Sequence, residues 1–392
     1  VYHVDDNLRC CGYYIKSCIL SLMTLFSNKS TWLEVDLSAI KNNVILFTKN
    51  KKVNVMAVVK ANAYGHGSVQ VARTALNAGA KWLAVARAEE ALELRNAKIT
   101  RPIVVLGFVP MCLVEQLISH EVSMVVWDVK QIKSIAAATN ALGVEAKLHV
   151  KIDTGMGRIG ASVDEARRIT NYVINTPSLL FEGLMTHYAC ADDDSLDVTR
   201  HQETVFKNIV YELSELGFVP TYTHASNSAA AMYGVRNQWD ITRLGIAMYG
   251  LDSSDSCKPF EDLKPALSWK SQLIQIKTVP KGTGISYGHD YVTTKDEIIG
   301  TVSTGYADGY RRNDNNLVLV GGKRVPVVGR VCMDQFMVNL DAVPESSVED
   351  EVVMIGTQGT ECITAEELAD RWNTINYEVV STIGHRVARK YI

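Results

Sequence analysis

The feature that most constrains the fold of this chain is the regular alternation of short apolar runs with longer stretches of helical character. Repeated strand–helix units of this length favour parallel strands that close into a (β/α)8 barrel. We therefore predict an α/β fold whose main domain is a TIM-type barrel. The eight runs are Val53–Val59, Trp82–Ala86, Pro102–Gly107, Ser123–Trp127, Lys147–Ile152, Phe181–Met185, Tyr222–His224 and Ile241–Met248.

After residue 264 the pattern changes to β-rich segments separated by Gly and Pro, which predicts a mostly-β C-terminal domain over residues 265–392. The segments are Trp269–Val279, Ile298–Ser303, Leu317–Val320, Val325–Val331 and Phe336–Leu340. Residues 31–37 alternate as a strand does, and Ser38 resembles the N-cap of a helix that begins near Ala39. We assign residues 31–264 to the barrel and leave open whether its first strand, 31–37, joins the β domain instead.

Residues 1–30 differ from the rest, and we interpret them as an extension that is truncated or disordered. The segment Tyr13–Phe26 is apolar but contains Lys16, and it is shorter than the roughly 20 residues that a spanning helix needs. An amphipathic or interfacial segment is favoured, and the end of a truncated membrane region is the alternative. Only that alternative would give the protein a membrane partner. No clear cleavage site of a signal peptide follows the apolar run.

Charge and cysteine usage exclude some classes of function. The net charge of -3 argues against a nucleic-acid partner, because neutralising phosphates takes a basic surface. The eight cysteines show no paired CxxC spacing, so we expect no structural zinc and no other metal. A disulfide framework is typical of short secreted chains, so a reduced, cytoplasmic location fits best.

Lys60 is the first candidate for chemistry. The string AVVKANAYGHG places it after an apolar strand and before a glycine-bearing loop, and active sites of barrels lie at the C-terminal strand ends. Partial burial would lower the pKa of this amine and free it to form a Schiff base. The alternative is an ordinary lysine that extends from a strand end into solvent.

Other strand ends carry polar strings as well. KIDTGMGRIG contains Lys151 and Arg158, and Arg158 could hold a carboxylate through two parallel hydrogen bonds, unless it is simply solvated. THYACAD contains His187, and HASNSAA begins with His224. Each histidine taken singly is only a weak indication of a functional site. HASNSAA runs into a helix N-terminus, and RLGI follows the last strand, so these two loops could form a phosphate site.

Taken together, the motifs of the chain closely resemble those of the alanine racemase family. The strings AVVKANAYGHG, KIDTGMGRIG, THYACAD, HASNSAA, RLGIAMYGL, ISYG, GYADGY and GRVCMDQ follow one another in the family's order from about residue 31 onward. The resemblance implies a barrel, a β domain and a head-to-tail homodimer in which each active site draws residues from both subunits. It also implies pyridoxal 5'-phosphate as cofactor and interconversion of L- and D-alanine, which supplies D-alanine for peptidoglycan.

The resemblance also implies roles for individual residues. Lys60 binds the cofactor covalently and is one of two bases, and Tyr287 of the partner subunit is the other. His187 and Arg243 form a chain behind Tyr287, and Arg243 faces the pyridine nitrogen. The remaining assignments concern three kinds of contact. The cofactor contacts are Tyr64, Asn227, Ser228, Gly245, Ile246 and His385, and all of them except Asn227 match positions that contact the phosphate. The substrate contacts are Arg158, Met333 and Asp334, with Tyr306 as a gate. Lys151 matches a lysine that is carbamylated in many members.

One departure from the family bears on the substrate. Many members carry a tyrosine where this chain has His385, which changes shape and charge beside the pocket. A serine racemase of the membrane-linked resistance type therefore stays an alternative. A decarboxylase of the same barrel class is disfavoured, because such enzymes have an acidic group at the pyridine nitrogen where this chain has Arg243. A non-enzymatic cofactor-binding barrel is a further alternative. Such proteins consist of the barrel alone, so the C-terminal region of this chain, which contains Tyr287 and Met333, argues for catalysis.

Overall fold

The structure, a computed structural model, describes residues 30–50, 53–233, 239–253 and 262–392. They form two compact units, and each is described by itself. One unit consists of residues 36–266 with Ile392, and the other combines residues up to 35 with residues 267–391. The expected segment 13–26 lies outside the described residues. Among the described helices, none has the length and apolar character needed to cross a membrane.

The first unit is an eight-stranded parallel barrel, as predicted. Its strands follow the order β8-β7-β6-β5-β4-β3-β2-β9. Backbone hydrogen bonds from Ile241 to Thr223 (3.3 Å) and from Arg243 to Ser226 (3.0 Å) bridge the remaining gap between β8 and β9. The strands are β2 (Val55–Val58), β3 (Trp82–Val85), β4 (Ile103–Val105), β5 (Ser123–Val126), β6 (Ala146–Lys151), β7 (Leu179–Met185), β8 (Tyr222–His224) and β9 (Thr242–Leu244).

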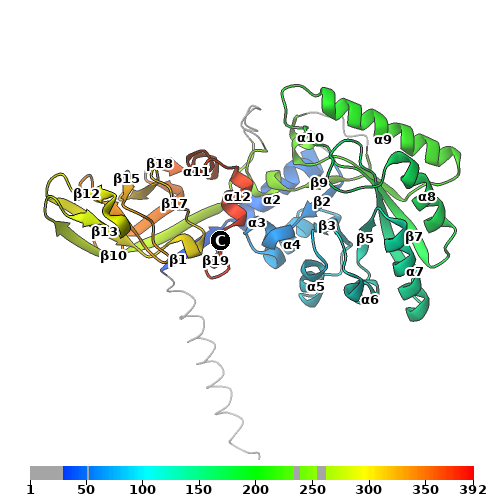
Figure 1. The fold of residues 1–392 in the computed structure, drawn as a ribbon, viewed down its shortest axis with the longest axis horizontal. Coiled ribbons are helices and arrows are strands. Elements are labelled where there is room, and N and C mark those ends of the chain that lie inside the picture. The colour runs from blue at the N-terminus through cyan, green and yellow to red at the C-terminus, as the bar shows by residue number, and fades with distance from the viewer. Residues whose placement is uncertain (1–29, 51–52, 234–238, 254–261) are drawn as a thin grey trace, which may run out of the picture. The chain divides into compact units, whose positions relative to one another are not determined.

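Amphipathic helices cover the barrel (Figure 1). They are α2 (Leu37–Ile45), α4 (Ser68–Asn77), α5 (Ala88–Asn96), α6 (Met111–Ser119), α7 (Val129–Leu142), α8 (Val163–Ile174), α9 (Asp197–Glu215) and α10 (Ser228–Tyr233). The short segment α3 (Lys60–Tyr64) is not a right-handed helix. In α8, Ala166, Ile169 and Val173 are buried at helical spacing, and Ser162 with Glu165 forms a capping box. The expected N-cap of α2 was wrong. Asp36 rather than Ser38 accepts from the N–H of Ala39, at 2.9 Å, because the helix begins at Leu37.

The second unit is mostly β, as predicted. Its main sheet has nine strands in the order β18-β17-β14-β15-β16-β13-β10-β1-β19, and β11 pairs with β12. The strands are β1 (Thr31–Val35), β10 (Leu267–Val279), β11 (Gly284–Ile285), β12 (Tyr291–Val292), β13 (Glu297–Val302), β14 (Leu317–Val320), β15 (Lys323–Val328), β16 (Phe336–Asn339), β17 (Glu351–Gln358), β18 (Glu361–Ile363) and β19 (Ala388–Tyr391), and the helices are α11 (Ala365–Trp372) and α12 (Asn376–Ser381).

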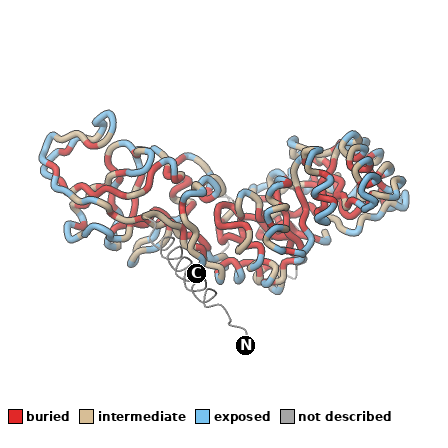
Figure 2. The backbone as a smooth tube through the Cα atoms, turned by 90° about the horizontal axis from the view of Figure 1, so that it is seen from below, coloured by how far each residue is buried: buried red, intermediate tan, exposed pale blue. Residues whose placement is uncertain are grey.

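Strand β1 lies in this β unit and not in the barrel. Leu33 is opposite Trp269 of the antiparallel neighbour β10 and opposite Arg389 of the parallel neighbour β19. An aromatic group forms the core of the unit, where Tyr310 stacks on Phe336 at 4.7 Å and meets Trp372 edge-on at 5.7 Å. Figure 2 shows buried segments in the interior of each unit and exposed loops around them.

Candidate active site

Lys60 leads into a left-handed turn at the C-terminal end of β2. Val58 ends the strand, and the backbone from Ala61 to Tyr64 has φ values between 52° and 54°. This region costs an L-residue roughly 1–2 kcal/mol, and glycine is its usual occupant. Four consecutive non-glycine residues in this conformation therefore concentrate backbone strain next to Lys60, as is typical of functional sites.

Hydrogen bonds on both sides hold the strained turn. The carboxylate of Glu90 accepts from the N–H of Ala61 at 2.6 Å. The side-chain oxygen of Asn62 accepts from the N–H of Ser68 at 2.9 Å. The backbone carbonyl of Asn62 accepts from the N–H of Gly67, also at 2.9 Å. The turn thereby fixes the direction in which the Lys60 side chain leaves the strand. Sequence reasoning missed Glu90, because nothing in its helical surroundings indicates a contact with this loop.

Cationic side chains gather around Lys60 at the C-terminal ends of the strands. Burial lowers the pKa of Lys60, and the charges of Arg158 and Arg243 lower it further. Burial together with the same two arginines lowers the pKa of Lys151 to about 8. Burial also lowers the pKa of Arg243 to about 10. Such an excess of buried positive charge is stabilised by an anion, so the cluster fits a ligand that carries phosphate and carboxylate groups.

The loop that carries Arg158 is shaped by Asp153. One oxygen of its carboxylate accepts from the N–H groups of Gly155, Met156 and Gly157 at 2.9 to 3.1 Å. At Gly160, φ is +140° and an added Cβ would lie 2.6 Å from the backbone nitrogen of Asp153. The loop therefore needs a glycine there, and its fixed shape presents Arg158, which is exposed within this unit.

Arg243 of β9 is the hub of a hydrogen-bond network. It is buried, and its terminal nitrogens donate to Nδ1 of His224 at 2.9 Å and to Nδ1 of His187 at 2.8 Å. It also donates to the carbonyls of Thr186, His224 and Ala225. Because Arg243 donates to both rings, each Nδ1 is an acceptor and each Nε2 carries the proton. Burial, followed by the charge of Arg243, holds the pKa of both histidines well below the usual value.

A small cradle lies between Tyr64 and the loops after β8 and β9. The Ser228 hydroxyl accepts from the N–H groups of Gly245 (2.9 Å) and Ala247 (3.4 Å). A Cβ added at Gly245 would lie 2.7 Å from the Tyr64 hydroxyl oxygen, so glycine is required for this approach. Ile246 is buried beside it. These N–H and O–H groups fit a phosphate. Asn227 has a structural contact as well, since its side chain accepts from the N–H of Ala230 at 3.0 Å.

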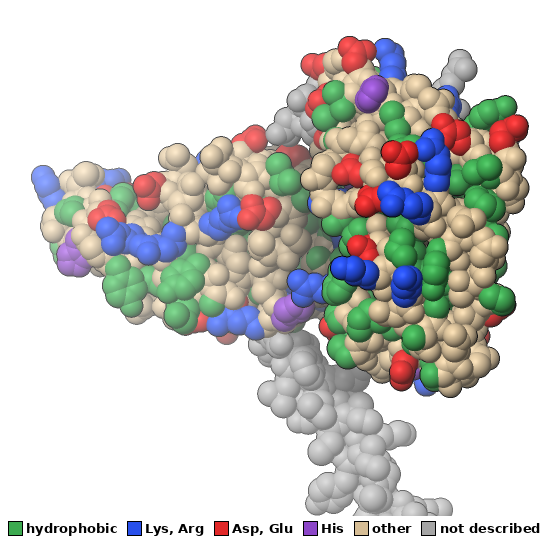
Figure 3. Space-filling view, turned by 45° about the vertical axis from the view of Figure 1, so that its right-hand side comes forward, with side chains coloured by type: hydrophobic (Ala, Val, Ile, Leu, Met, Phe, Trp, Pro, Cys, Tyr) green, Lys and Arg blue, Asp and Glu red, His purple; other side chains and the backbone are tan. Residues whose placement is uncertain are grey.

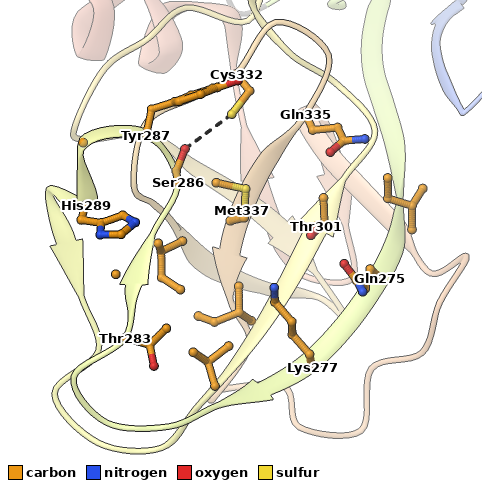
Figure 4. A pocket seen from close by; sticks show the side chains of 16 residues that line it. Gln275, Lys277, Thr283, Ser286, Tyr287, His289, Thr301, Cys332, Gln335 and Met337 are labelled. Carbon is orange, nitrogen blue, oxygen red and sulfur yellow. Dashed lines mark hydrogen bonds between the residues drawn. The ribbon is translucent and has the colours of Figure 1, made fainter.

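Tyr287 lies on a loop of the β unit and is 72% exposed. The preceding residue, Ser286, has a φ of +65°, and its hydroxyl donates to the carbonyl of Arg330 at 2.6 Å. That hydroxyl also lies 3.5 Å from the Cys332 sulfur. Figure 4 shows Tyr287, Ser286 and Cys332 at one end of an open groove of about 850 Å³. The contacts with residues 330–332 therefore hold the Tyr287 loop.

Tyr306, Met333 and Asp334 lie together in the same unit. The N–H groups of Tyr306 and Ala307 donate to the carbonyls of Cys332 and Met333, both at 3.0 Å. An added Cβ at Gly305 would lie 2.3 Å from the Met333 carbonyl oxygen, so this packing requires glycine. Tyr306 and Met333 are 44% and 54% exposed, which leaves two large side chains available for contact with another molecule.

His385 is exposed and precedes Arg386, a residue that sequence reasoning missed. The Arg386 guanidinium donates to Asp308 at 2.6 Å and 3.0 Å and lies 2.7 Å from the Asp334 carboxylate. It thereby ties the segment containing His385 to the GYADGY and GRVCMDQ strings. The sequence does not predict these ion pairs, because Asp308, Asp334 and Arg386 are far apart in the chain.

The comparisons with known proteins agree with this arrangement. The profile described as "Alanine racemase, N-terminal domain" matches residues 35–253, and that of the C-terminal domain matches residues 266–391. The chain belongs to the alanine racemase family. It is accordingly an amino-acid racemase. The alanine racemase of Halothermothrix orenii is 42% identical over 367 residues, which cover 93% of this chain and 97% of that protein.

Solved structures of the alanine racemase family are similar over the same extent. The alanine racemase from Bacillus anthracis with bound L-Ala-P has a TM-score of 0.89 and 42% identity, covering 93% of this chain and 95% of that one. The histidine racemase from Leuconostoc mesenteroides has a TM-score of 0.86 and 28% identity, covering 93% and 98%. The two structures are named for different amino acids, so similarity of fold alone does not identify the substrate.

Proposed function

We propose that this racemase interconverts L- and D-alanine with pyridoxal 5'-phosphate as cofactor and two bases. The observation that carries the proposal is Lys60, which leaves a barrel strand through a strained turn and stands near the charges of Arg158 and the buried Arg243. An amine with a lowered pKa is available as a nucleophile toward an aldehyde. In the cell the product D-alanine would serve peptidoglycan synthesis.

The residues of the barrel unit fit the cofactor. Lys60 would hold it covalently, and the cradle of Tyr64, Ser228 and the N–H of Gly245 would take the phosphate, with Asn227 and Ile246 at its border. Arg243 would face the pyridine nitrogen, and Arg158 the phenolate. When bound, the cofactor supplies an electron sink that makes the Cα–H of the amino acid acidic. Arg243 keeps its charge near neutral pH, so it does not readily donate a proton to the ring nitrogen.

Racemisation requires that a proton leave one face of Cα and that another arrive at the opposite face. We assign these steps to the amine of Lys60 and the phenol of Tyr287. Arg243 donates to Nδ1 of His187 at 2.8 Å, which leaves the Nε2–H of His187 as a donor. A donor directed at the Tyr287 oxygen would stabilise the phenolate. The chain of Arg243 and His187 would thus prepare Tyr287 as a base.

We further infer that Tyr287 reaches the site from a partner subunit, in a head-to-tail homodimer. Three residues expected at the active site, Tyr287, Tyr306 and Met333, are exposed within the β unit, with exposed fractions of 44% to 72%. On the β unit, to the left in Figure 3, hydrophobic side chains lie beside a row of Lys and Arg side chains. Exposed aromatic and apolar groups beside charges are typical of protein interfaces.

The substrate carboxylate would be bound by Arg158 and the Met333 segment, with Asp334 held by Arg386 beside it and Tyr306 as the gate. Alanine is the first candidate, because the relatives that match nearly the whole of this chain are alanine racemases. Serine is the second candidate, because His385 is a polar ring at a position where family members often have tyrosine, and an imidazole can accept a hydroxyl proton.

The deciding experiment incubates the purified protein and pyridoxal phosphate with single L-amino acids and measures the D-isomers. We expect D-alanine to form fastest. Formation of D-serine in preference would replace alanine by the second candidate, and absence of every D-isomer would overturn the proposal. Borohydride reduction should attach the cofactor to Lys60, and a label on another lysine would contradict the assigned binding residue.

A further inference from the structure

A polar network below the proposed cofactor site leads from Arg243 through the interior of the barrel to a buried carboxylate. His224 contacts His149 of β6, with 2.8 Å between Nε2 and Nδ1. His149 in turn contacts Glu182 of β7, with 3.0 Å between Nε2 and Oε2. The hydroxyl of Ser123, the first residue of β5, also donates to that carboxylate oxygen. Both histidines are fully buried, and Glu182 is 8% exposed.

Contacts across the sheet show that this network lies inside the barrel. Ser123 and Glu182 belong to β5 and β7, which are separated by β6 in the strand order, so their side chains must face the same side. Trp82 of β3 meets His149 edge-on at 5.6 Å and Tyr222 of β8 at 5.3 Å. Strands β3 and β6 are not neighbours, and their side chains therefore meet in the interior of the barrel.

The donors and acceptors of the network allow one arrangement of protons. Arg243 can only donate, so Nδ1 of His224 accepts and its Nε2–H donates to Nδ1 of His149. The Nε2–H of His149 then donates to Glu182. The opposite arrangement would point an N–H of His224 at an N–H of Arg243. Burial, with the charge of Arg243, keeps the pKa of His224 well below its usual value, in agreement with a neutral ring.

We propose that Glu182 is a positioning residue: as the acceptor at the end of this chain of hydrogen bonds, it holds the rings of His149 and His224 in place and, through them, the Arg243 guanidinium. The tautomers follow from the geometry, and their effect on the reaction rests on the proposed function. Glu182 lies three residues before the end of β7, beside Ser123 at the start of β5. It is therefore on the side of the barrel away from Lys60, and it acts through the two histidines without touching substrate or cofactor.

Two costly features of the sequence support a functional role for this network. The first is the buried carboxylate of Glu182, since a buried charged group usually stabilises a protein less than an apolar side chain of similar volume. Gly183 interrupts the interior of β7, although glycine weakens a strand. A Cβ added at Gly183 would lie 2.2 Å from Nδ1 of His149, so glycine is required for His149 to occupy its position. Both features maintain the network at the expense of stability.

The test compares Glu182→Gln with Glu182→Leu. The amide oxygen of glutamine can still accept from His149, whereas leucine removes the acceptor. We expect kcat to fall about tenfold or more in Glu182→Leu and less than about threefold in Glu182→Gln, as for other partners that orient a ligand or catalytic group from behind. Thr139→Val is the matched control, because it removes a hydrogen bond of 2.7 Å from the buried Thr139 to Ser178, outside the network; it should lower Tm without lowering kcat.

A second readout does not depend on the reaction. In the cofactor-free full chain labelled with 15N-histidine, NMR should show a protonated Nε2 and an unprotonated Nδ1 for His149 and His224. Glu182→Gln should keep both Nε2–H signals at their hydrogen-bonded, downfield positions. Glu182→Leu should move the His149 signal upfield and shift that of His224, because the acceptor that holds the His149 ring is gone. If Glu182→Leu does not fold, His149→Phe retains a ring beside Trp82, removes both hydrogen bonds, and should likewise shift the Nε2–H signal of His224.

The outcomes separate this inference from the proposed function. An unchanged Nε2–H signal of His224 in Glu182→Leu or in His149→Phe would overturn it, as would equal losses of kcat in the leucine and glutamine variants. If the wild-type protein produced no D-amino acid, the proposed function would fail, and the NMR signals would still decide whether Glu182 holds the two histidine rings in place.

Discussion

At the scale of single residues, the charge of Lys151 depends on its surroundings. Burial and two nearby arginines lower its pKa to about 8, so the neutral amine makes up about a tenth of the molecules at pH 7 and about nine-tenths at pH 9. Only a neutral amine reacts with carbon dioxide, forming a carbamate with release of one proton. The product would replace a cation by an anion among the arginines and so relieve the excess positive charge.

We therefore predict that Lys151 is carbamylated increasingly as pH rises from 7 to 9. Protein incubated with 13C-bicarbonate should give a carbamate signal in 13C NMR that grows over this range and disappears on acidification. Lys151→Arg is the control, because arginine cannot form the adduct. A signal that persists in this variant would assign the carbamate to another amine, and no signal at pH 9 would refute the prediction.

His385 is the residue at which substrate preference can be tested. A pocket rejects an added hydroxyl by only about a hundredfold, and an imidazole partner for that hydroxyl contributes about 1 kcal/mol net. We predict alanine as the preferred substrate, measurable activity with serine, and a shift toward alanine in His385→Tyr. The measurement is the ratio of kcat/KM for L-serine to that for L-alanine. An equal ratio in both proteins would remove His385 from the specificity argument.

At the scale of elements, the left-handed turn after Lys60 makes a prediction about stability. Ala61 has a φ of 52°, so Ala61→Gly removes a steric cost of about 1–2 kcal/mol and adds about 1 kcal/mol of chain entropy to the unfolded state. We expect unfolding in denaturant to show a free energy that is unchanged or up to about 1 kcal/mol higher.

Ala137→Gly is the matched control for this prediction. Ala137 is exposed in the right-handed helix α7, where the same substitution should lower the free energy of unfolding by about 1 kcal/mol. Equal destabilisation at both positions would show that the turn at Ala61 carries no such strain in solution.

At the scale of the whole molecule, the shared active site predicts complementation between two inactive variants. Lys60→Ala and Tyr287→Phe should each be nearly inactive as homodimers, because every site lacks one base. A heterodimer of the two contains one intact site, so an equal mixture after subunit exchange should regain about a quarter of the wild-type activity, half of the dimers being mixed. If exchange is demonstrated by mass and no activity returns, both bases belong to one subunit.

The strand pattern was readable from the sequence because barrel strands are buried runs between helices, and all eight predicted runs correspond to strands β2 to β9. The candidate residues at strand ends, such as Lys60 and Arg243, were found for the same reason, since C-terminal strand ends of a barrel share one edge. Their chemistry also depends on residue type alone: a lysine can bind an aldehyde and an arginine keeps its charge.

Partners that meet across the sheet were decided only by the tertiary structure. Glu182 stands within an apolar string and His149 within a strand, and neither gives a signal in the sequence. Likewise, Arg386 meets Asp308 and Asp334 only after three distant segments pack together. Residue type and periodicity determine which elements form, because those depend on local geometry. Strand register and side-chain direction determine which polar groups meet, and these are fixed only when the sheet closes and buries them.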